Sequence, residues 1–387
     1  MAGAIVVGGF EVPGWGGLAT ATYRLFETML AHGLDAWYVN LVRAEDRERF
    51  RGLLGSACEN PRGLPRVHTA VLEAPLHEPQ AGLAALLAEL SPRPMVGAGD
   101  IAAYLMKRAA PRAPIVLLTG GCMQVDPAAP LTGFDWGRAD PPAPDWKERE
   151  AVEMAELVLT HSDVVLRLYR HFYPRHARRI HPRVIWFAEW IHAEAREHAG
   201  AARPFGERDV DALFVASSWS RQEKACRLVA EVTERLAGSS VHVVGEAAEP
   251  IPGAEHHGVL GRAELFRLMG RARTVACPSS FDAAPGILFE ASALGCNPVA
   301  SRNCGNWEVC HEELLAEPWT ADAFAQAIRR GRERKLPDRM DRFLASGSYR
   351  ELTRVLLDET AWAPRAAPAS PVGLAPALSC VVPHQRL

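Results

Sequence analysis

The stretch "TVACPSSFDAAPGILFEASALGCNPVAS", from Thr274 to Ser301, combines a strand, a turn, a helix and the start of another strand. A short apolar run ends at Pro278, Pro285-Gly286 forms the turn, and "ILFEASALG" begins a helix that stops at a Gly-Cys-Asn-Pro turn. A strand, a helix and a further strand in succession predict a parallel sheet covered by helices. The same stretch places Asp282 and Glu290 on opposite sides of its turn.

This alternation continues along most of the chain and predicts an α/β fold. Two series of strands and helices are separated by the polar stretch 192–209, which we expect to be a hinge. They predict two Rossmann-like, doubly wound domains facing each other across a cleft, with ligands at the carboxyl ends of the strands. Strands are expected at 4–9, 35–42, 114–121, 157–163, 183–190, 211–218, 241–246 and 274–280, and helices at 18–33, 221–238, 262–272 and from 287 onward.

We expect an N-terminal domain over residues 1–187 and a C-terminal domain over 188–362, whose last helices cross back to the first domain. The Ala/Pro-rich residues 363–387 form the last segment, which we expect to be loosely ordered.

The composition of the 387 residues is that of a soluble enzyme, with 48% hydrophobic residues and a net charge of -3. This charge gives no electrostatic reason to expect binding to nucleic acid or to an acidic membrane. We see neither a signal peptide nor an apolar stretch of about twenty residues, and therefore expect a cytoplasmic protein. The eight cysteines form no CxxC motif and are interpreted as reduced thiols.

Asp282 and Glu290 fit a nucleotide sugar. The amides at the start of the helix, at Pro285-Gly286-Ile287-Leu288, offer a seat for phosphate. Glu290, about one turn into the helix, could bind a ribose diol, and Asp282 could hold hydroxyls of a second sugar. The alternative is that Asp282 is a solvated loop acid and that Glu290 only complements the helix dipole.

The stretch resembles the E-x7-E region of retaining GT-B glycosyltransferases of family 4, with Asp282 in place of the first Glu. "HHGVLGRAELFRLMGRARTVACPSSFD" resembles the run that begins at the base-binding Gly of this family, here Gly258 with Val259. "LFVASSWSRQEKACRLV" resembles its diphosphate-binding strand and loop, with Arg221 and Lys224 as the cations.

The resemblance covers about residues 4–330 and is weaker in the first half. Gly14, Gly16 and Gly17 fall where the family has its N-terminal Gly-rich loop, and "NPVASRNCGNWEV" resembles its G-x-x-E loop, with Gly305 and Glu308. The resemblance implies that the N-terminal domain binds the acceptor and the C-terminal domain binds the donor, with Gly16 and Gly17 also on the donor side.

The acceptor side departs from the family pattern. Where members carry histidines after two N-terminal strands, this chain has "VGAGD" and "LLTGGC", with Gly121 in place of His. Gly121 either leaves room for an unusual acceptor or only serves a tight turn. His161 could face the acceptor or be a structural histidine, and Trp15 could stack on a sugar or belong to the core.

Other motifs favour structural roles. Asp209 and Asp211 form a nominal DxD, but they lead into a strand at the amino end of the sheet, so we expect no metal site there. Glu189, Trp190 and His192, at the start of the expected hinge or just before it, are interpreted as interdomain packing. "GGFEVPGWGG" is not GxGxxG, and no acid ends the next strand, which makes a dehydrogenase a poor fit.

We therefore expect a retaining glycosyltransferase that uses a nucleoside diphosphate sugar and needs neither a cofactor nor a metal ion. Arg221, Lys224 and Asp282 are the expected catalytic residues. Alternatives are a nucleotide-sugar hydrolase or epimerase of the same fold and a non-catalytic nucleotide-sugar-binding protein.

Overall fold

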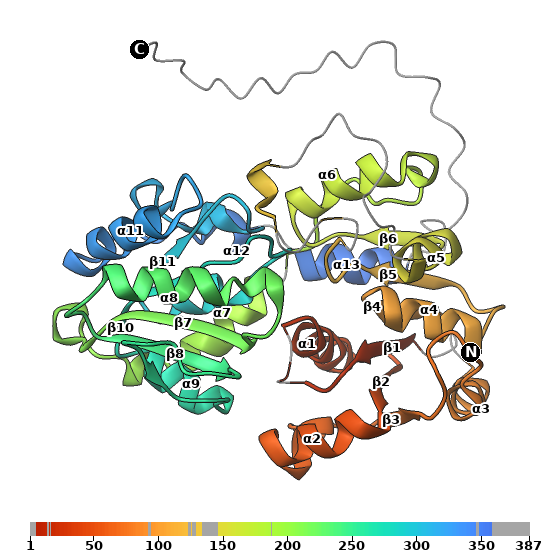
Figure 1. Ribbon diagram of the computed structural model, residues 1–387. Helices are drawn as coiled ribbons and strands as arrows, with labels where there is room; N and C mark the ends of the chain where they lie inside the picture. The colour runs from red at the N-terminus through yellow and green to blue at the C-terminus, as the bar shows by residue number, and fades with distance from the viewer. Residues whose placement is uncertain are drawn as a thin grey trace, which may run out of the picture.

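A computed structural model describes residues 5–13, 15, 17–91, 94–122, 125, 129–133, 146–186, 188–345 and 348–357. Within these residues the chain forms two separate parallel sheets, one in each half of the sequence. Figure 1 shows the two sheets side by side, each with helices packed on it.

The N-terminal sheet has six parallel strands in the order β3-β2-β1-β4-β5-β6. This is the doubly wound order, in which the chain reverses direction across the sheet between β1 and β4. The strands are β1 (Ile5–Phe10), β2 (Ala36–Arg43), β3 (Val67–Leu72), β4 (Met95–Ala98), β5 (Ile115–Leu118) and β6 (Leu157–Leu159). Its helices are α1 (Gly17–Ala31), α2 (Ala44–Leu54), α3 (Ala81–Leu90), α4 (Asp100–Ala109), α5 (Trp146–Met154) and α6 (Asp163–Phe172).

The C-terminal sheet has five parallel strands in the order β11-β10-β7-β8-β9, and its order reverses between β7 and β10. The strands are β7 (Val210–Ser218), β8 (Val241–Glu246), β9 (Glu255–His256), β10 (Ala272–Cys277) and β11 (Asn297–Ala300). The helices of this half are α7 (Ala188–Glu197), α8 (Cys226–Arg235), α9 (Arg262–Met269), α10 (Gly286–Ala293), α11 (Ala321–Glu333), α12 (Asp341–Leu344) and α13 (Ser348–Leu357). The expectation of two doubly wound, Rossmann-like sheets is confirmed.

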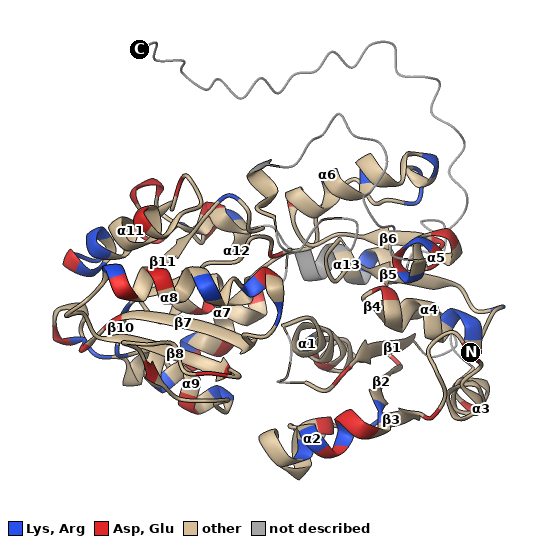
Figure 2. Cartoon of the chain, viewed as in Figure 1, with Lys and Arg blue, Asp and Glu red and all other residues tan. Residues whose placement is uncertain are grey.

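The strands are apolar because helices cover both faces of each sheet. In β5 all four residues are buried, and most of β7 and β10 is buried too. Figure 2 shows the complementary pattern, with charged residues mainly on helices and loops and the strands largely uncharged.

Helix α13 lies beside β5 and β6 of the N-terminal half (Figure 1). Its Leu352 and Val355 belong to the same apolar cluster as Leu118 and Leu159 of those strands. The end of the described chain therefore packs on the first sheet, while the domain boundaries at 187 and 362 stay predictions.

Two sequence expectations were wrong. Residues 183–190 do not form a strand: the chain is irregular to Trp186 and enters α7 at Ala188. Helix α7 continues to Glu197, because Ala, Glu and Arg favour helix and the apolar residues Ala188, Ile191 and Ala195 recur on its buried side. The hinge expected at 192–209 stays a prediction.

The helix expected at 221–238 begins late. Residues Gln222–Lys224 form a 3-10 turn, Ala225 adopts a left-handed backbone (φ 54°), and only then does α8 start at Cys226. A regular helix from residue 221 would place Arg221 and Lys224, three positions apart, on one face of its first turn. This expectation was wrong, because the two residues do not share the first turn of an α-helix.

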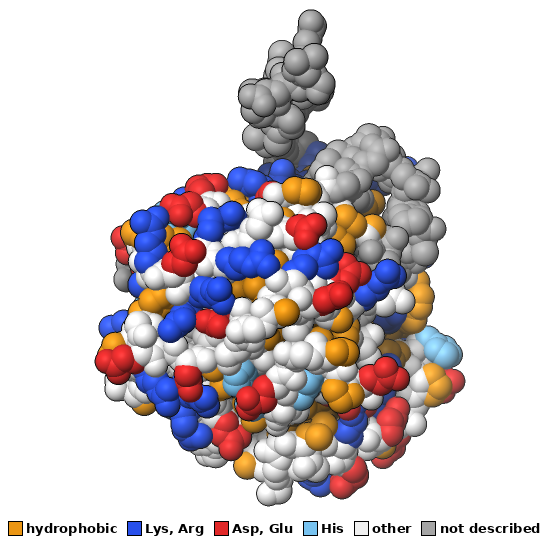
Figure 3. All heavy atoms as spheres, turned by 60° about the vertical axis from the view of Figure 1, so that its left-hand side comes forward, with side chains coloured by type: hydrophobic (Ala, Val, Ile, Leu, Met, Phe, Trp, Pro, Cys, Tyr) orange, Lys and Arg blue, Asp and Glu red, His pale blue; other side chains and the backbone are white. Residues whose placement is uncertain are grey.

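No helix within the described ranges is both long and apolar enough to cross a membrane. The seven cysteines in the described part of the chain are free thiols. Figure 3 shows acidic and basic side chains interspersed over one face of the molecule.

Candidate functional site

The best candidate site lies where the C-terminal sheet reverses its order, between β7 and β10. The segment after β7 carries Lys224 and the loop after β10 carries Asp282, and Lys224 Nζ lies 2.5 Å from Asp282 Oδ2. Both side chains are mostly buried, at 17% and 18% exposure. Burial is the largest single effect and disfavours the charge of Lys224, but the Asp282 carboxylate and Cys277 together outweigh it, so the pKa of Lys224 lies above its ordinary value. Ligands of doubly wound folds bind at this kind of position.

The loop around Asp282 is fixed by its backbone. The amide of Gly305 donates to the carbonyl oxygen of Asp282 at 2.7 Å, and Asp282 also forms an isolated parallel bridge with Cys304. A Cβ at Gly305 would lie 1.9 Å from the carbonyl oxygen of Ala283 and 2.7 Å from Cβ of Ser162. Glycine is therefore required where this loop meets the segment after β6 of the other half.

His161, two residues after the end of β6, approaches the same point from the N-terminal half. Its ring is buried, its Nδ1 lies 3.2 Å from Thr119 Oγ1, and it interacts electrostatically with Asp282. Burial lowers the pKa of His161 to about 4, although the Asp282 carboxylate opposes this shift. The structure thus brings His161 close to Asp282 as an uncharged imidazole at neutral pH.

Arg221 lies near an acidic residue of the N-terminal half, Glu11. Glu11 directly follows β1 and interacts electrostatically with Arg221, and its backbone is left-handed (φ 73°). Burial raises the pKa of Glu11, with Arg221 opposing the shift. The Arg221 side chain is 54% exposed and also contacts Glu223, whereas Lys224 is committed to Asp282.

Glu290 lies inside α10 and is buried. Its Oε1 accepts from Arg262 Nη1 at 2.8 Å, and Arg262 Nη2 also donates to Glu194 on α7 at 2.8 Å. Burial disfavours the charge of Arg262, but Glu290 and Glu194 more than compensate, so the pKa of Arg262 is raised. In this structure the Glu290 carboxylate therefore already has a cationic partner.

Glu194 continues these contacts into the N-terminal half, where Arg24 of α1 pairs with it. We call Arg24, Glu194, Arg262 and Glu290 the ionic chain. A second pair joins the two halves on the surface, between Arg49 of α2 and Glu246 at the end of β8.

The start of α10 offers backbone groups to a ligand. Pro285 is the N-cap residue and Gly286 the first helical residue, while the amide of Leu288 already donates to the carbonyl oxygen of Pro285 at 3.3 Å. The side chain of Leu288 is fully buried, and Ile287 packs partly into the core. The first-turn amides that lack such a partner, those of Gly286 and Ile287, are therefore the groups open to a phosphate.

The acceptor-side candidates have different surroundings. Trp15 is 8% exposed and packs on Phe50 with ring centroids 4.9 Å apart, so most of its ring belongs to the core. Gly121 has no described atom within 4 Å of an ideal Cβ and does not need a left-handed backbone. These surroundings favour open space over a turn requirement at Gly121. Gly17 begins α1, whereas Gly14 and Gly16 lie outside the described residues.

Gly258 and Val259 lie where the two halves meet. Gly258 has a left-handed backbone (φ 63°), and its carbonyl oxygen accepts from the amide of Gly245 at 2.7 Å. Val259 packs against an apolar cluster of the N-terminal half that includes Val12 and Trp15.

Both acidic side chains of the nominal DxD motif form ion pairs with arginines. Asp209 pairs with Arg271 at 2.8 Å and Asp211 pairs with Arg273 at 3.1 Å. Asp211 is the second residue of β7, at the opposite end of the strand from Lys224.

Sequence reasoning overlooked two residues of this region. Glu11 lies in a Gly-rich segment directly after the first strand. Because ligands of doubly wound folds bind at the carboxyl ends of strands, this position could have indicated a site residue. Arg262 opens α9 three residues after Val259, and no sequence pattern indicated that it would reach Glu290.

Part of the chain matches a known protein family. Residues 209–332, which include Lys224, Asp282 and Glu290, match the model of the family described as "Glycosyl transferases group 1". A search of curated proteins finds no match.

Solved structures resemble the chain over nearly its whole length. HepE of Anabaena in complex with UDP is 14% identical, with a TM-score of 0.55 over 92% of this chain and 99% of HepE. Sucrose-phosphate synthase of Thermosynechococcus elongatus is 17% identical, with a TM-score of 0.59 over 93% of this chain and 96% of the synthase. The fold is GT-B. The UDP-GlcNAc 2-epimerase of Methanocaldococcus jannaschii shares this GT-B architecture at 12% identity, with a TM-score of 0.52 over 92% of this chain and 99% of the epimerase.

Proposed function

We propose that the protein is a cytoplasmic, retaining glycosyltransferase that moves a sugar from a nucleoside diphosphate sugar to an acceptor. The observation that carries the proposal is the buried Lys224–Asp282 pair at the reversal point of the C-terminal sheet, beside the start of α10 and facing His161. Cations, helix amides and a carboxylate at one point suit a ligand that combines phosphates with sugar hydroxyls.

The cations Arg221 and Lys224 stabilise the departing diphosphate. Negative charge grows on this group as the bond between the sugar C1 and the phosphate oxygen breaks, so fixed cations bind the transition state more strongly than the ground state. Lys224 is held in place by Asp282, while the more exposed Arg221 can turn from Glu223 toward the phosphates. These side chains supply the charge that a metal ion provides in other enzymes, so transfer needs no metal.

The acceptor oxygen bonds to C1 on the face from which the diphosphate leaves, which retains the anomeric configuration. The electrons of the broken bond pass to the phosphate oxygen, and this oxygen takes the proton of the acceptor hydroxyl. His161 is uncharged at neutral pH and buried, which suits a role in positioning the acceptor beside Asp282.

The nucleoside is held by the C-terminal half. Glu290 binds the ribose diol while keeping its contact with Arg262, and Gly258 and Val259 line the base. Structures of HepE contain UDP, UDP with glucose, or UDP-glucose, which makes uridine nucleotides the first donors to test. Gly121 leaves room for the acceptor, which the N-terminal half binds.

The test compares Lys224→Ala with Arg227→Ala. Arg227 lies three residues further along but is 92% exposed and pairs only with Glu231 among the described residues, so its loss should leave transfer unchanged. Lys224→Ala should lower kcat by about a hundredfold or more, as for other preorganised donors, with a smaller loss of donor affinity. Transfer from UDP-sugars to an acceptor panel, followed by chromatography, measures the effect. Equal kcat in both folded variants contradicts the proposal, and release of free sugar or an epimer without acceptor assigns the site to a hydrolase or an epimerase instead.

A further inference from the structure

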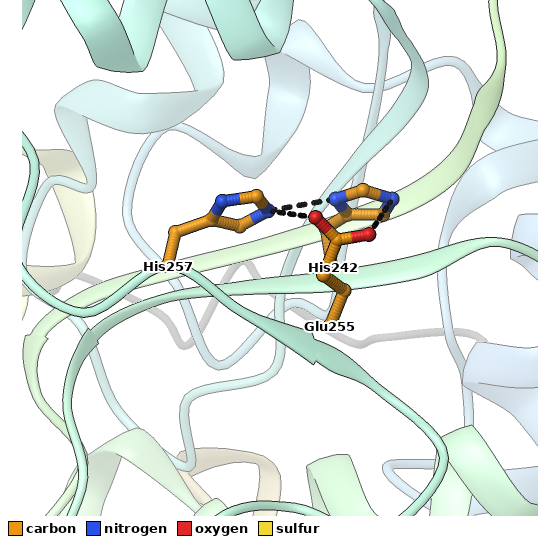
Figure 4. Close-up of side chains that lie close together, drawn as sticks. All are labelled: His242, Glu255 and His257. Atoms are coloured by element: carbon orange, nitrogen blue, oxygen red, sulfur yellow. Dashed lines mark hydrogen bonds and ion pairs between the residues drawn. The ribbon is translucent and has the colours of Figure 1, made fainter.

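Three side chains that the proposed transfer does not use converge at the outer edge of the C-terminal sheet. His242 lies on β8, Glu255 on β9, and His257 directly after β9, and one ligand atom of each lies within 4.8 Å of the others. Figure 4 shows the two imidazole rings and the carboxylate pointing toward one another.

Strand geometry explains this convergence. His242 is paired in register with Glu255, and His257 follows Glu255 by two residues, so the three side chains project from one face of the sheet. His242 lies on an inner strand of the sheet, β8, and Glu255 lies on the edge strand beside it, β9. His242 is 4% exposed, whereas the Glu255 side chain is 64% exposed, so the cluster opens toward solvent on the carboxylate side.

The distances suit a small cation held by nitrogen and oxygen. His242 Nδ1 lies 2.8 Å from His257 Nε2, and Glu255 Oε1 lies 3.6 Å from the same His257 nitrogen. Two nitrogens bound to tetrahedral zinc at about 2.0 Å are about 3.3 Å apart. Opening the ring–ring contact by about half an ångström, through small side-chain rotations, therefore makes room for the ion.

The second nitrogen of His242 is already held. Its Nε2 lies 3.0 Å from Ser240 Oγ and 3.7 Å from Glu255 Oε2, which fixes the ring so that Nδ1 faces His257. Metal-binding histidines usually have such a partner on the nitrogen that does not bind the metal. An additional imidazole nearby, His256, is occupied separately by the amide of Ile251 at 2.7 Å.

We propose that His242, Glu255 and His257 bind one Zn²⁺ ion, with water completing its coordination. Imidazole and carboxylate ligands favour zinc over Mg²⁺ or Ca²⁺, which prefer all-oxygen sites. None of the three residues is assigned to the transfer site. His242 lies four residues along β8 from Glu246 at the interface of the two halves, or about 13 Å of extended strand, whereas His257 directly precedes Gly258.

The bound ion links two segments of the chain. It ties β8 to the chain immediately before Gly258, and β9 itself contributes only two residues to the sheet. The segment 255–260 is otherwise attached to β8 by few bonds, including those from the amide of His257 to Val243 at 3.0 Å and from the amide of Gly245 to Gly258 at 2.7 Å. Zinc should therefore slow the opening of this segment.

The experiment measures zinc affinity by competition with a chromophoric chelator, without any nucleotide. His257→Gln removes a ligand at a partly exposed position and should weaken binding at this site by about a hundredfold or more, and Ser240→Ala should weaken it by about tenfold. His77→Ala, at an exposed histidine in the other half of the chain, is the control and should bind as the wild type does.

Hydrogen–deuterium exchange gives a second readout that does not depend on zinc bound elsewhere. Zn²⁺ should slow exchange of the amides of residues 255–260 in the wild type and in His77→Ala, but not in His257→Gln. Zinc affinity in His257→Gln equal to that of the control, or exchange in 255–260 that Zn²⁺ leaves unchanged in the wild type, would overturn the proposal.

Discussion

Replacing Glu290 by glutamine should weaken binding of the nucleoside diphosphate itself. The variant keeps the shape of the side chain but removes the charge that the ribose diol and Arg262 share. One charged hydrogen-bonding partner contributes about 1.5–3 kcal/mol, so the Kd for UDP should rise by about tenfold to a hundredfold.

The same substitution also affects folding, and the two effects must be separated. Glu290 Oε1 lies 2.8 Å from Arg262 Nη1, and the Glu290 side chain is 8% exposed, so the contact is little screened by water. Arg262 keeps its 2.8 Å contact with Glu194 in the variant. The free energy of unfolding should therefore fall by only one charged contact, about 1.5–3 kcal/mol, rather than by the cost of an unpaired buried charge.

Glu194→Gln is the matched control. It removes the other acidic partner of Arg262 and also the contact with Arg24, so it should destabilise the protein at least as much as Glu290→Gln does. Because Glu194 is not assigned to the nucleotide, its variant should bind UDP within about twofold of the wild type. Urea unfolding measures stability, and titration calorimetry at a temperature where both variants are folded measures affinity. Equal losses of UDP affinity in the two variants would refute the assignment of Glu290 to the ribose.

Three further predictions concern the same region. EDTA should leave kcat at saturating donor unchanged, and added Mg²⁺ or Mn²⁺ should not raise it; loss of transfer that these ions restore would contradict the role given to Arg221 and Lys224. His161 has a folded pKa of about 4 against 6.5 in the unfolded chain, so the unfolded state binds the extra proton and stability should fall by about 3 kcal/mol as the pH drops from 6.5 to 4. His161→Asn should reduce this pH dependence in urea unfolding series, and an unchanged slope would argue against a buried neutral imidazole. Gly305→Ala should lose more than about tenfold in kcat, because its Cβ would meet the Ala283 carbonyl oxygen at 1.9 Å and shift the Asp282 loop, whereas Gly121→Ala should remain folded with the melting temperature of the wild type.

Much of the fold was predictable because its strands are buried on both faces. A continuous apolar run such as β5 is recognised as a buried strand once Pro, Gly or polar turns flank it. The position of Asp282 followed from the same logic, since the carboxyl end of a strand is fixed once the strand is recognised. The segment 183–190 misled the prediction because its apolar residues serve packing between elements rather than a sheet.

The side-chain partners were not predictable in the same way. Contacts such as that of Arg262 with Glu290 or of His242 with His257 join residues whose distance depends on the packing of several elements. The expected common face of Arg221 and Lys224 assumed a regular helix, but the left-handed backbone of Ala225 interrupts it. Local sequence carries no signal for a conformation that surrounding contacts impose.

Two of the charged links between the halves of the molecule differ in how far salt can weaken them. In the ionic chain, the Arg24 and Glu194 side chains are 11% and 13% exposed, whereas Arg49 and Glu246 of the surface pair are 43% and 40% exposed. Dissolved ions screen exposed charges far more than buried ones. We therefore expect rising ionic strength to release the α2 side first while α1 stays attached to α7, so that the halves swing apart about the ionic chain as a pivot.

Small-angle scattering should then show a larger radius of gyration in high salt for the wild type, and the same enlarged radius already in low salt for Arg49→Ala. A radius that does not change with salt in the wild type would contradict this motion. The molecule would then open on the side of the exposed pair and stay closed on the side of the buried pair. The difference in burial between the two pairs would thereby set the direction from which a donor enters.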